Sequence, residues 1–227
     1  MNETLRLVRL LQMASPMLPV GAYAYSQGME WLIDEKMLTD VQQIGQWIHS
    51  VMELPLAQYE LPVLLRMMRA CHAGDADSLA DWNGQFVASR DTTEGRAETL
   101  QMGYSLLRLA REMPDFGADD LAILAGQTEV AFPCAWAWMT SAWQLDETDS
   151  MLGYAWSWLE NQVAVVMKTL PLGQVAGQTL LAQCGKSLPE IVRNAMDLPD
   201  DMLNSVSPLY SMAGCWHETQ YSRLFRS

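Results

Sequence analysis

The segment from Asp149 to Gly173, DSMLGYAWSWLENQVAVVMKTLPLG, constrains the fold more than any other part of the chain. Thr148 or Asp149 can cap the start of a helix here, and Pro171 with Gly173 can end it. Apolar side chains surround most of this helix, which is typical of a buried one. One stripe of small or polar residues recurs every three or four positions, and we expect it to meet solvent or to admit a second helix. This stripe consists of Gly153, Ser157, Glu160, Asn161, Ala164 and Lys168.

The remaining sequence predicts further helices separated by polar or proline-containing breaks. Asp40 with Gln43 resembles a capping box, which marks a helix start. Residues 53–55 (Glu-Leu-Pro) predict a break, and Asp119 can cap a short helix over 121–128. No sustained two-residue alternation suggests strands. We therefore predict an all-α, single-domain bundle of about nine or ten helices spanning residues 1–227, with a flexible C-terminal tail at 206–227.

The charge balance and the cysteines restrict the class of protein. The chain has 27 acidic and 14 basic residues, a formal net charge of -13, and this argues against nucleic-acid binding because phosphates need basic partners. The four cysteines are widely spaced without a C-x-x-C pair, which suits free thiols in a cytoplasmic protein. The longest uncharged run, residues 130–145, contains a proline and is short for a membrane span. We expect no membrane association.

Few residues are arranged for catalysis or metal binding. Asp146, Glu147 and Asp149 could hold Mg²⁺ as in helical enzymes that use diphosphates, but the second acidic motif of such enzymes is missing, and a loop with a helix cap explains the cluster. Cys215 and His217 could bind a soft metal such as nickel, yet no third ligand lies nearby. The sequence therefore predicts no catalytic residue, no cofactor and no resident metal, with the Mg²⁺-dependent enzyme as the alternative.

The last eleven residues, HETQYSRLFRS, differ in composition from the rest of this acidic chain. Arg223 and Arg226 lie among the large side chains Tyr221, Leu224 and Phe225. Aromatic and arginine side chains are enriched at the energetic centres of protein interfaces, whereas a free chain end is usually polar and disordered. Composition leaves two alternatives open, namely a segment that docks on a partner and one that packs on its own domain.

Four stretches together resemble one known family. They are the loop LPVGAYAYSQGMEW, the helix YAWSWLENQVAVVMKTLPLGQ, the end HETQYSRLFRS, and the pattern of Arg90, Thr92, Glu94 and Arg96. Their order and spacing are similar to those of the urease accessory protein F family over nearly the whole chain. The resemblance implies a non-enzymatic, all-α homodimer that binds urease accessory protein H, called D in many bacteria. That complex recruits the GTPase accessory protein G, which delivers nickel to apo-urease.

The resemblance also implies roles for particular residues. Tyr23, the aromatic residue after the P-V-G turn, and Lys168, the basic residue before L-P-L-G-Q, belong to the surface offered to the GTPase. This replaces the simpler interpretation of Lys168 as a solvated charge complementing the helix dipole. The tail becomes the docking segment for accessory protein H. Its implied contact residues are His217, Glu218, Tyr221, Ser222, Arg223, Leu224, Phe225 and Arg226.

Overall fold

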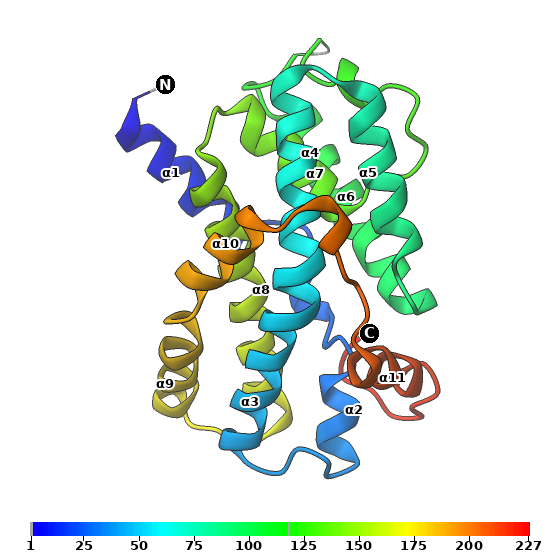
Figure 1. Cartoon of the computed structure of the whole chain (residues 1–227). Helices are drawn as coiled ribbons and strands as arrows, with labels where there is room; N and C mark the ends of the chain where they lie inside the picture. The colour runs from blue at the N-terminus through cyan, green and yellow to red at the C-terminus, as the bar shows by residue number, and fades with distance from the viewer. Residues whose placement is uncertain (1, 118) are drawn as a thin grey trace.

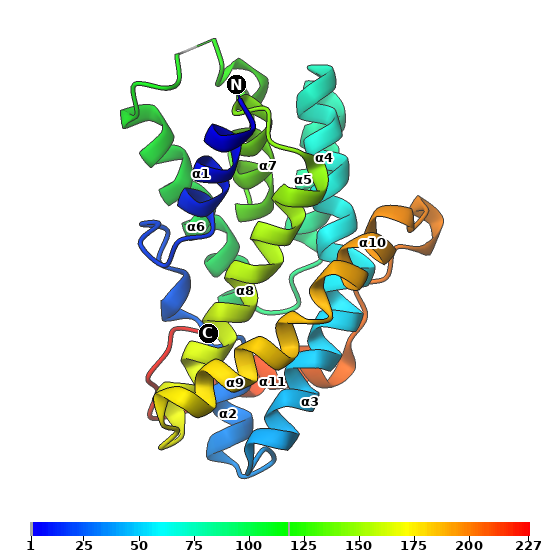
Figure 2. The same ribbon diagram turned by 90° about the vertical axis from the view of Figure 1, so that its left-hand side faces the viewer.

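Helix α8 (Glu147–Thr169) runs through the middle of the molecule, and the other helices pack around it (Figures 1 and 2). The structure is a computed structural model that describes residues 2–117 and 119–227. The helix begins earlier than predicted because the Asp146 carboxylate accepts the N–H groups of Thr148 and Asp149. It ends where Leu170 becomes extended ahead of Pro171. The central helix is thus confirmed, with its start moved to residue 147.

The small and polar stripe of α8 faces other parts of the chain. A side chain at Gly153 would place its Cβ 2.7 Å from Leu10 Cδ1 of helix α1 (Glu3–Met13), so the glycine permits close approach of α1. Farther along, Asn161 is buried and donates from Nδ2 to the Tyr25 carbonyl oxygen at 3.0 Å. The stripe therefore positions α1 and the segment that follows it.

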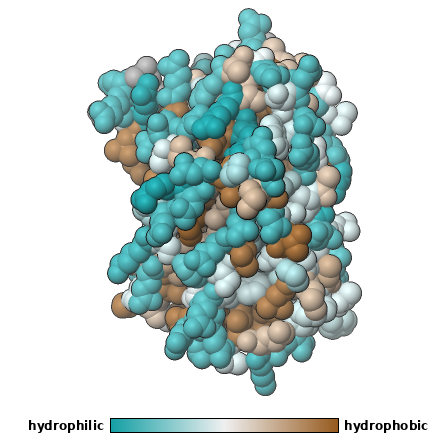
Figure 3. Space-filling model, viewed as in Figure 1, coloured by the Kyte–Doolittle hydropathy of each residue, from teal (hydrophilic) through white to brown (hydrophobic). Residues whose placement is uncertain are grey.

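The described residues contain helices and no strand, which confirms the all-α class. Helix α7 carries the buried Trp136 and Trp138 and packs between α4 and α6. Figure 3 shows that hydrophilic side chains dominate the surface in one view, with scattered apolar ones. None of the helices in the described part of the chain has the length and apolarity that crossing a membrane requires. The remaining helices are α2 (Met29–Asp34), α3 (Val41–Val51), α4 (Leu61–Ala73), α5 (Ala76–Ala88), α6 (Thr93–Glu112), α7 (Phe132–Ala142), α9 (Gln174–Gly185), α10 (Leu188–Asp197) and α11 (Pro208–His217).

Two local predictions are wrong. The predicted break at 53–55 is a π-helical segment, Met52–Glu60, that joins α3 to α4 with Pro55 inside it. Such wider turns shift the backbone hydrogen bonds to other partners, so a proline without an N–H group can be accommodated inside the helix. The helix predicted over 121–128 is only a 3₁₀ turn, Ala122–Leu124, and Gly126 soon follows with a left-handed φ of 89°. That conformation ends right-handed helix.

The C-terminal region also differs from the prediction of a flexible tail. Residues 208–217 form helix α11, and residues 218–227, here called the C-terminal strap, lie against the body of the protein beside α2 (Figure 1). Phe225 and Ser227 are each only 5% exposed. Of the two alternatives left open by composition, packing on its own domain describes this structure. Buried polar anchors on α2 and α6, invisible in local sequence, are the reason.

Candidate functional site

Helix α11 crosses very close to the start of α2, which sets the position of the strap. Gly28, the residue before α2, has a φ of 80°, and a Cβ there would lie 2.6 Å from the Ala213 carbonyl carbon. A glycine therefore satisfies both the left-handed backbone and the close contact. Beside this crossing, the rings of Trp31 and Trp216 stack with centroids 4.4 Å apart. The two helices form one rigid support for the segment that follows.

His217, a predicted docking residue, is fully buried between two carboxylates. Its Nδ1 lies 2.7 Å from Glu94 Oε2, and its Nε2 lies 3.2 Å from Glu30 Oε2. Each ring nitrogen thus lies within hydrogen-bonding distance of one carboxylate oxygen. Cys215, the other half of the possible soft-metal pair, is exposed. His217 therefore serves as an internal anchor rather than as an accessible ligand.

The strap is held by main-chain and side-chain bonds to the same two carboxylates. Glu30 accepts from the backbone N–H of Leu224 at 2.6 Å and of Phe225 at 3.2 Å. Arg223 forms an ion pair with Glu94. As a result the Phe225 ring turns inward, while Leu224 remains 71% exposed.

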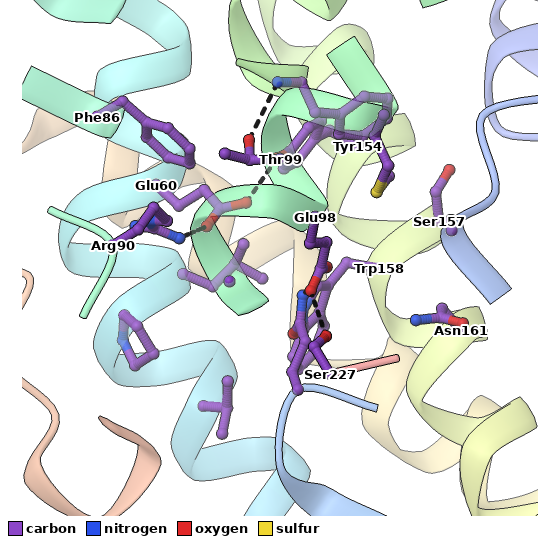
Figure 4. Close-up of a pocket in the computed structure, with 18 of the residues that line it drawn as sticks. Glu60, Phe86, Arg90, Glu98, Thr99, Tyr154, Ser157, Trp158, Asn161 and Ser227 are labelled. Carbon is purple, nitrogen blue, oxygen red and sulfur yellow. Dashed lines mark hydrogen bonds and ion pairs between the residues drawn. The ribbon is translucent and has the colours of Figure 1, made fainter. Parts of the chain in front are cut away.

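The end of the strap is fixed by the loop that precedes α2. The main-chain oxygen of Ser227 accepts from Ser26 N at 2.5 Å, Ser26 Oγ at 2.6 Å and Gln27 N at 3.0 Å. Ser227 Oγ in turn donates to Glu98 Oε2 at 2.7 Å, as Figure 4 shows. Burial raises the pKa of Glu98 to about 7, because desolvation disfavours the charged carboxylate.

Tyr23 and Lys168, predicted to face the GTPase, lie beside the strap. The Tyr23 hydroxyl donates to Glu160 Oε2 at 3.1 Å, and its pKa is raised by burial and by that carboxylate. Lys168 Nζ is 3.4 Å from the Tyr23 carbonyl oxygen and 5.2 Å from the centroid of the Phe225 ring. The structure thus brings the two groups of predicted contact residues, far apart in sequence, to adjoining positions.

The predicted docking residues divide into anchors and exposed side chains. His217 and Phe225 are buried, and the Glu218 carboxylate accepts from the backbone N–H of Glu94 at 3.1 Å. The others are exposed. They are Tyr221, Ser222, Arg223, Leu224 and Arg226. They form a basic and apolar surface on an acidic protein, called here the strap surface, and Lys168 lies beside it.

A partly polar cavity of about 140 Å³ lies behind the strap (Figure 4). On its wall Glu60 pairs with Arg90 at 3.3 Å and accepts from the Tyr154 hydroxyl at 2.5 Å. The buried atoms Arg90 Nε and Asn161 Oδ1 have no hydrogen-bond partner among residues 2–117 and 119–227. A cavity needs roughly 10–15 Å³ of such volume to hold one water, so this one has room for more than one. Arg90 belongs to the sequence pattern of Arg90, Thr92, Glu94 and Arg96, but nothing in the sequence indicated that its side chain lines a cavity.

The acidic cluster considered for Mg²⁺ is used for local structure. The Asp146 carboxylate caps α8, and Glu147 lies 3.3 Å from the Arg69 guanidinium. Asp149 lies in the first turn of the same helix, where a negative charge is favourable. Across residues 2–117 and 119–227 no group of three or more His, Cys, Asp or Glu side chains could hold a metal ion.

Comparison with known proteins gives consistent matches along the chain. The family model described as UreF matches residues 38–185. A urease accessory protein UreF from Methylobacillus flagellatus is 45% identical over 227 residues, covering 100% of both chains. Proteins of the same name from Dechloromonas aromatica and an Azoarcus species are 46% and 44% identical. The former match covers 100% of both chains, and the latter covers 98% of this chain and 96% of its relative.

Proposed function

Because the chain belongs to the UreF family of urease accessory proteins, we propose that it acts in urease maturation as a non-enzymatic scaffold. In this proposal it is a cytoplasmic homodimer that binds accessory protein H, called D in many bacteria. The resulting complex recruits the GTPase accessory protein G and regulates it while nickel enters apo-urease. Nickel is cargo here, and this chain supplies binding surfaces rather than reacting groups.

The observation that carries the proposal is the two-sided construction of the strap. Its inner side is fixed by Phe225 and by hydrogen bonds to buried groups, and its outer side presents Tyr221 and Leu224, which are 104% and 71% exposed. Large exposed side chains on a fixed backbone bind with little loss of conformational entropy. Exposed apolar side chains that gather on one segment are more typical of a binding surface than single scattered ones are.

Charge supports the choice of partner face. Arg226, together with Arg223 in its ion pair with Glu94, gives the strap surface a basic character, although the whole chain carries -13. An acidic partner face with an apolar pocket complements this surface and would be steered toward it. We assign that face to accessory protein H.

The position of Lys168 and Tyr23 supports a neighbouring site for the GTPase. Lys168 contacts the Tyr23 carbonyl oxygen and lies over the Phe225 ring of the strap. A protein bound to the strap would therefore lie next to one bound at Lys168. Adjoining sites allow one partner to add contacts to the other, which makes joint binding tighter than separate binding. This arrangement suits a scaffold that acts only when both partners are present.

Co-purification with accessory protein H tests the main proposal. Leu224→Ala in the full chain is expected to weaken capture by at least tenfold, because it removes an exposed apolar contact. Val175→Ala is the matched control, since Val175 is an apolar side chain that is 82% exposed on another element, α9. Failure of the unmodified, folded chain to capture protein H would contradict the proposal.

The GTPase site has a separate test. Lys168→Ala is expected to prevent recruitment of protein G to the complex with protein H while leaving capture of H intact. Lys186→Ala removes the same charge from an exposed position after α9 and is expected to change neither. Equal recruitment by the unmodified chain and both variants would refute the assignment of Lys168.

A further inference from the structure

Glu30 is a buried carboxylate whose hydrogen-bond partners, within the described residues, come from the C-terminal end of the chain. The residue is 5% exposed in the first turn of α2. One oxygen accepts from Leu224 N, and the other accepts from Phe225 N and lies 3.2 Å from His217 Nε2. A buried carboxylate is costly unless it is fully hydrogen-bonded. The strap and the last turn of α11 are what make the burial of Glu30 possible.

We infer that Glu30 is the positioning residue of the strap surface. Its carboxylate binds two consecutive backbone N–H groups, an arrangement that fixes the direction of the chain at that point. This fixed direction turns Phe225 inward beneath Lys168 and Leu224 outward. That the outward side chains bind accessory protein H rests on the proposed function. That Glu30 fixes their direction does not.

The other acidic groups near the strap cannot substitute for Glu30. Glu94 reaches the strap through the Arg223 side chain, and Glu98 reaches it through the Ser227 hydroxyl. Side chains rotate about several bonds, so such contacts restrain the backbone weakly. The bonds from Ser26 and Gln27 fix the main chain at Ser227. The Arg226 N–H also donates to the Ala24 carbonyl oxygen, at 2.7 Å. Glu30 binds the main chain at Leu224 and Phe225, where an exposed side chain is followed by a buried one.

Trypsin cleavage after Arg223 in the full, folded chain measures release of the strap. In Glu30→Gln an amide NH₂ replaces one accepting oxygen and confronts a donor, either a backbone N–H or the His217 ring. We expect the cleavage rate to rise at least tenfold and the affinity for protein H to fall at least tenfold. Glu35→Gln, the matched control, removes the same charge from an exposed residue at the end of α2 and is expected to leave both unchanged.

A second variant removes the same hydrogen bond from the strap side and leaves Glu30 in place. Leu224→Pro has no N–H to donate to Glu30, whereas Leu224→Ala keeps it. Trypsin does not cleave an Arg–Pro bond, so hydrogen exchange of residues 218–227 is the measurement for this pair. We expect fast exchange in the proline variant and slow exchange in the alanine variant. This pair keeps the test decisive if Glu30→Gln disturbs folding, which circular dichroism would reveal.

The outcomes separate the two ideas. Unchanged protection in folded Glu30→Gln and in Leu224→Pro would overturn the positioning role. Strap release in both variants, with no binding of protein H even by the unmodified chain, would leave the positioning role intact and reject the proposed function.

Discussion

Replacing Phe225 by alanine is expected to detach the C-terminal strap while the helical body stays folded. The ring is 5% exposed and lies beneath Lys168. Removing a buried phenylalanine ring costs about 3–5 kcal/mol when the surroundings stay in place. The strap follows the last helix, so it can leave without unfolding the rest, and the loss is limited to the free energy that holds the strap. Taking about 3 kcal/mol, at 1.4 kcal/mol per factor of ten, the open strap becomes roughly a hundredfold more populated.

Hydrogen exchange followed by mass spectrometry measures this opening directly. Peptides covering residues 218–227 should exchange roughly a hundredfold faster in Phe225→Ala, and peptides from α7 and α8 should not change. Leu224→Ala is the matched control, because that side chain is 71% exposed and its backbone N–H still bonds to Glu30. Unchanged exchange in the strap would refute the anchoring role of Phe225. Equally faster exchange throughout the body would refute the idea that the strap opens as a local unit.

Four further changes test other parts of the structure. Gly103→Ala is expected to lower the unfolding free energy by roughly 2 kcal/mol or more, since its Cβ would lie 2.1 Å from the Val130 carbonyl oxygen. A Cβ at Gly84 on α5 would meet no atom within 4 Å beyond the adjoining backbone of its own helix, so Gly84→Ala should raise the unfolding free energy by about 0.5–1 kcal/mol. Equal melting temperatures for Gly103→Ala and Gly84→Ala would contradict this reasoning. The pKa of Glu98 is about 7 in the folded chain and near 4.3 in the unfolded chain, so the unmodified protein loses stability as pH rises from about 5 to 8. Glu98→Gln lacks this titration, and its unfolding free energy should therefore rise relative to that of the unmodified chain by up to about 3 kcal/mol across the same window. Urea denaturation at several pH values measures the difference, and a constant difference would show that Glu98 does not titrate in this way. Asp146→Ala should lower the unfolding free energy by about 1 kcal/mol through loss of the α8 cap. Added Mg²⁺ should leave the melting temperatures of this variant and of the unmodified chain unchanged, whereas the alternative of a Mg²⁺-dependent enzyme predicts a higher melting temperature for the unmodified chain only.

Local signals in the sequence predicted the elements that local physics controls. Asp40 accepts the backbone N–H of Gln43 at the start of α3, as the capping-box pattern indicated. The apolar surroundings of α8 predicted its burial correctly. The π-helical segment around Pro55 was missed, because proline normally ends a helix and the wider turn that retains it depends on packing.

The candidate site was predicted only in part. The composition of residues 217–227 identified a segment with interface character, and the resemblance to a family added Tyr23 and Lys168. Neither distinguished the anchors His217 and Phe225 from the exposed Leu224. Glu30 was not selected at all, because nothing in the neighbouring sequence marks this glutamate as buried.

Periodicity, capping and composition act over a few residues, so the helical class, the central helix and the unusual composition of the chain end could be predicted from the sequence. The direction in which the strap faces and the groups that hold it depend on packing between distant parts of the chain. The bonds from Leu224 and Phe225 to Glu30 span 194 and 195 residues, and the contact of Lys168 with Tyr23 spans 145. Such contacts exist only after the helices between them have packed, so no local pattern encodes them. The sequence therefore identified which residues have interface character, and the fold determines how they are arranged into one surface.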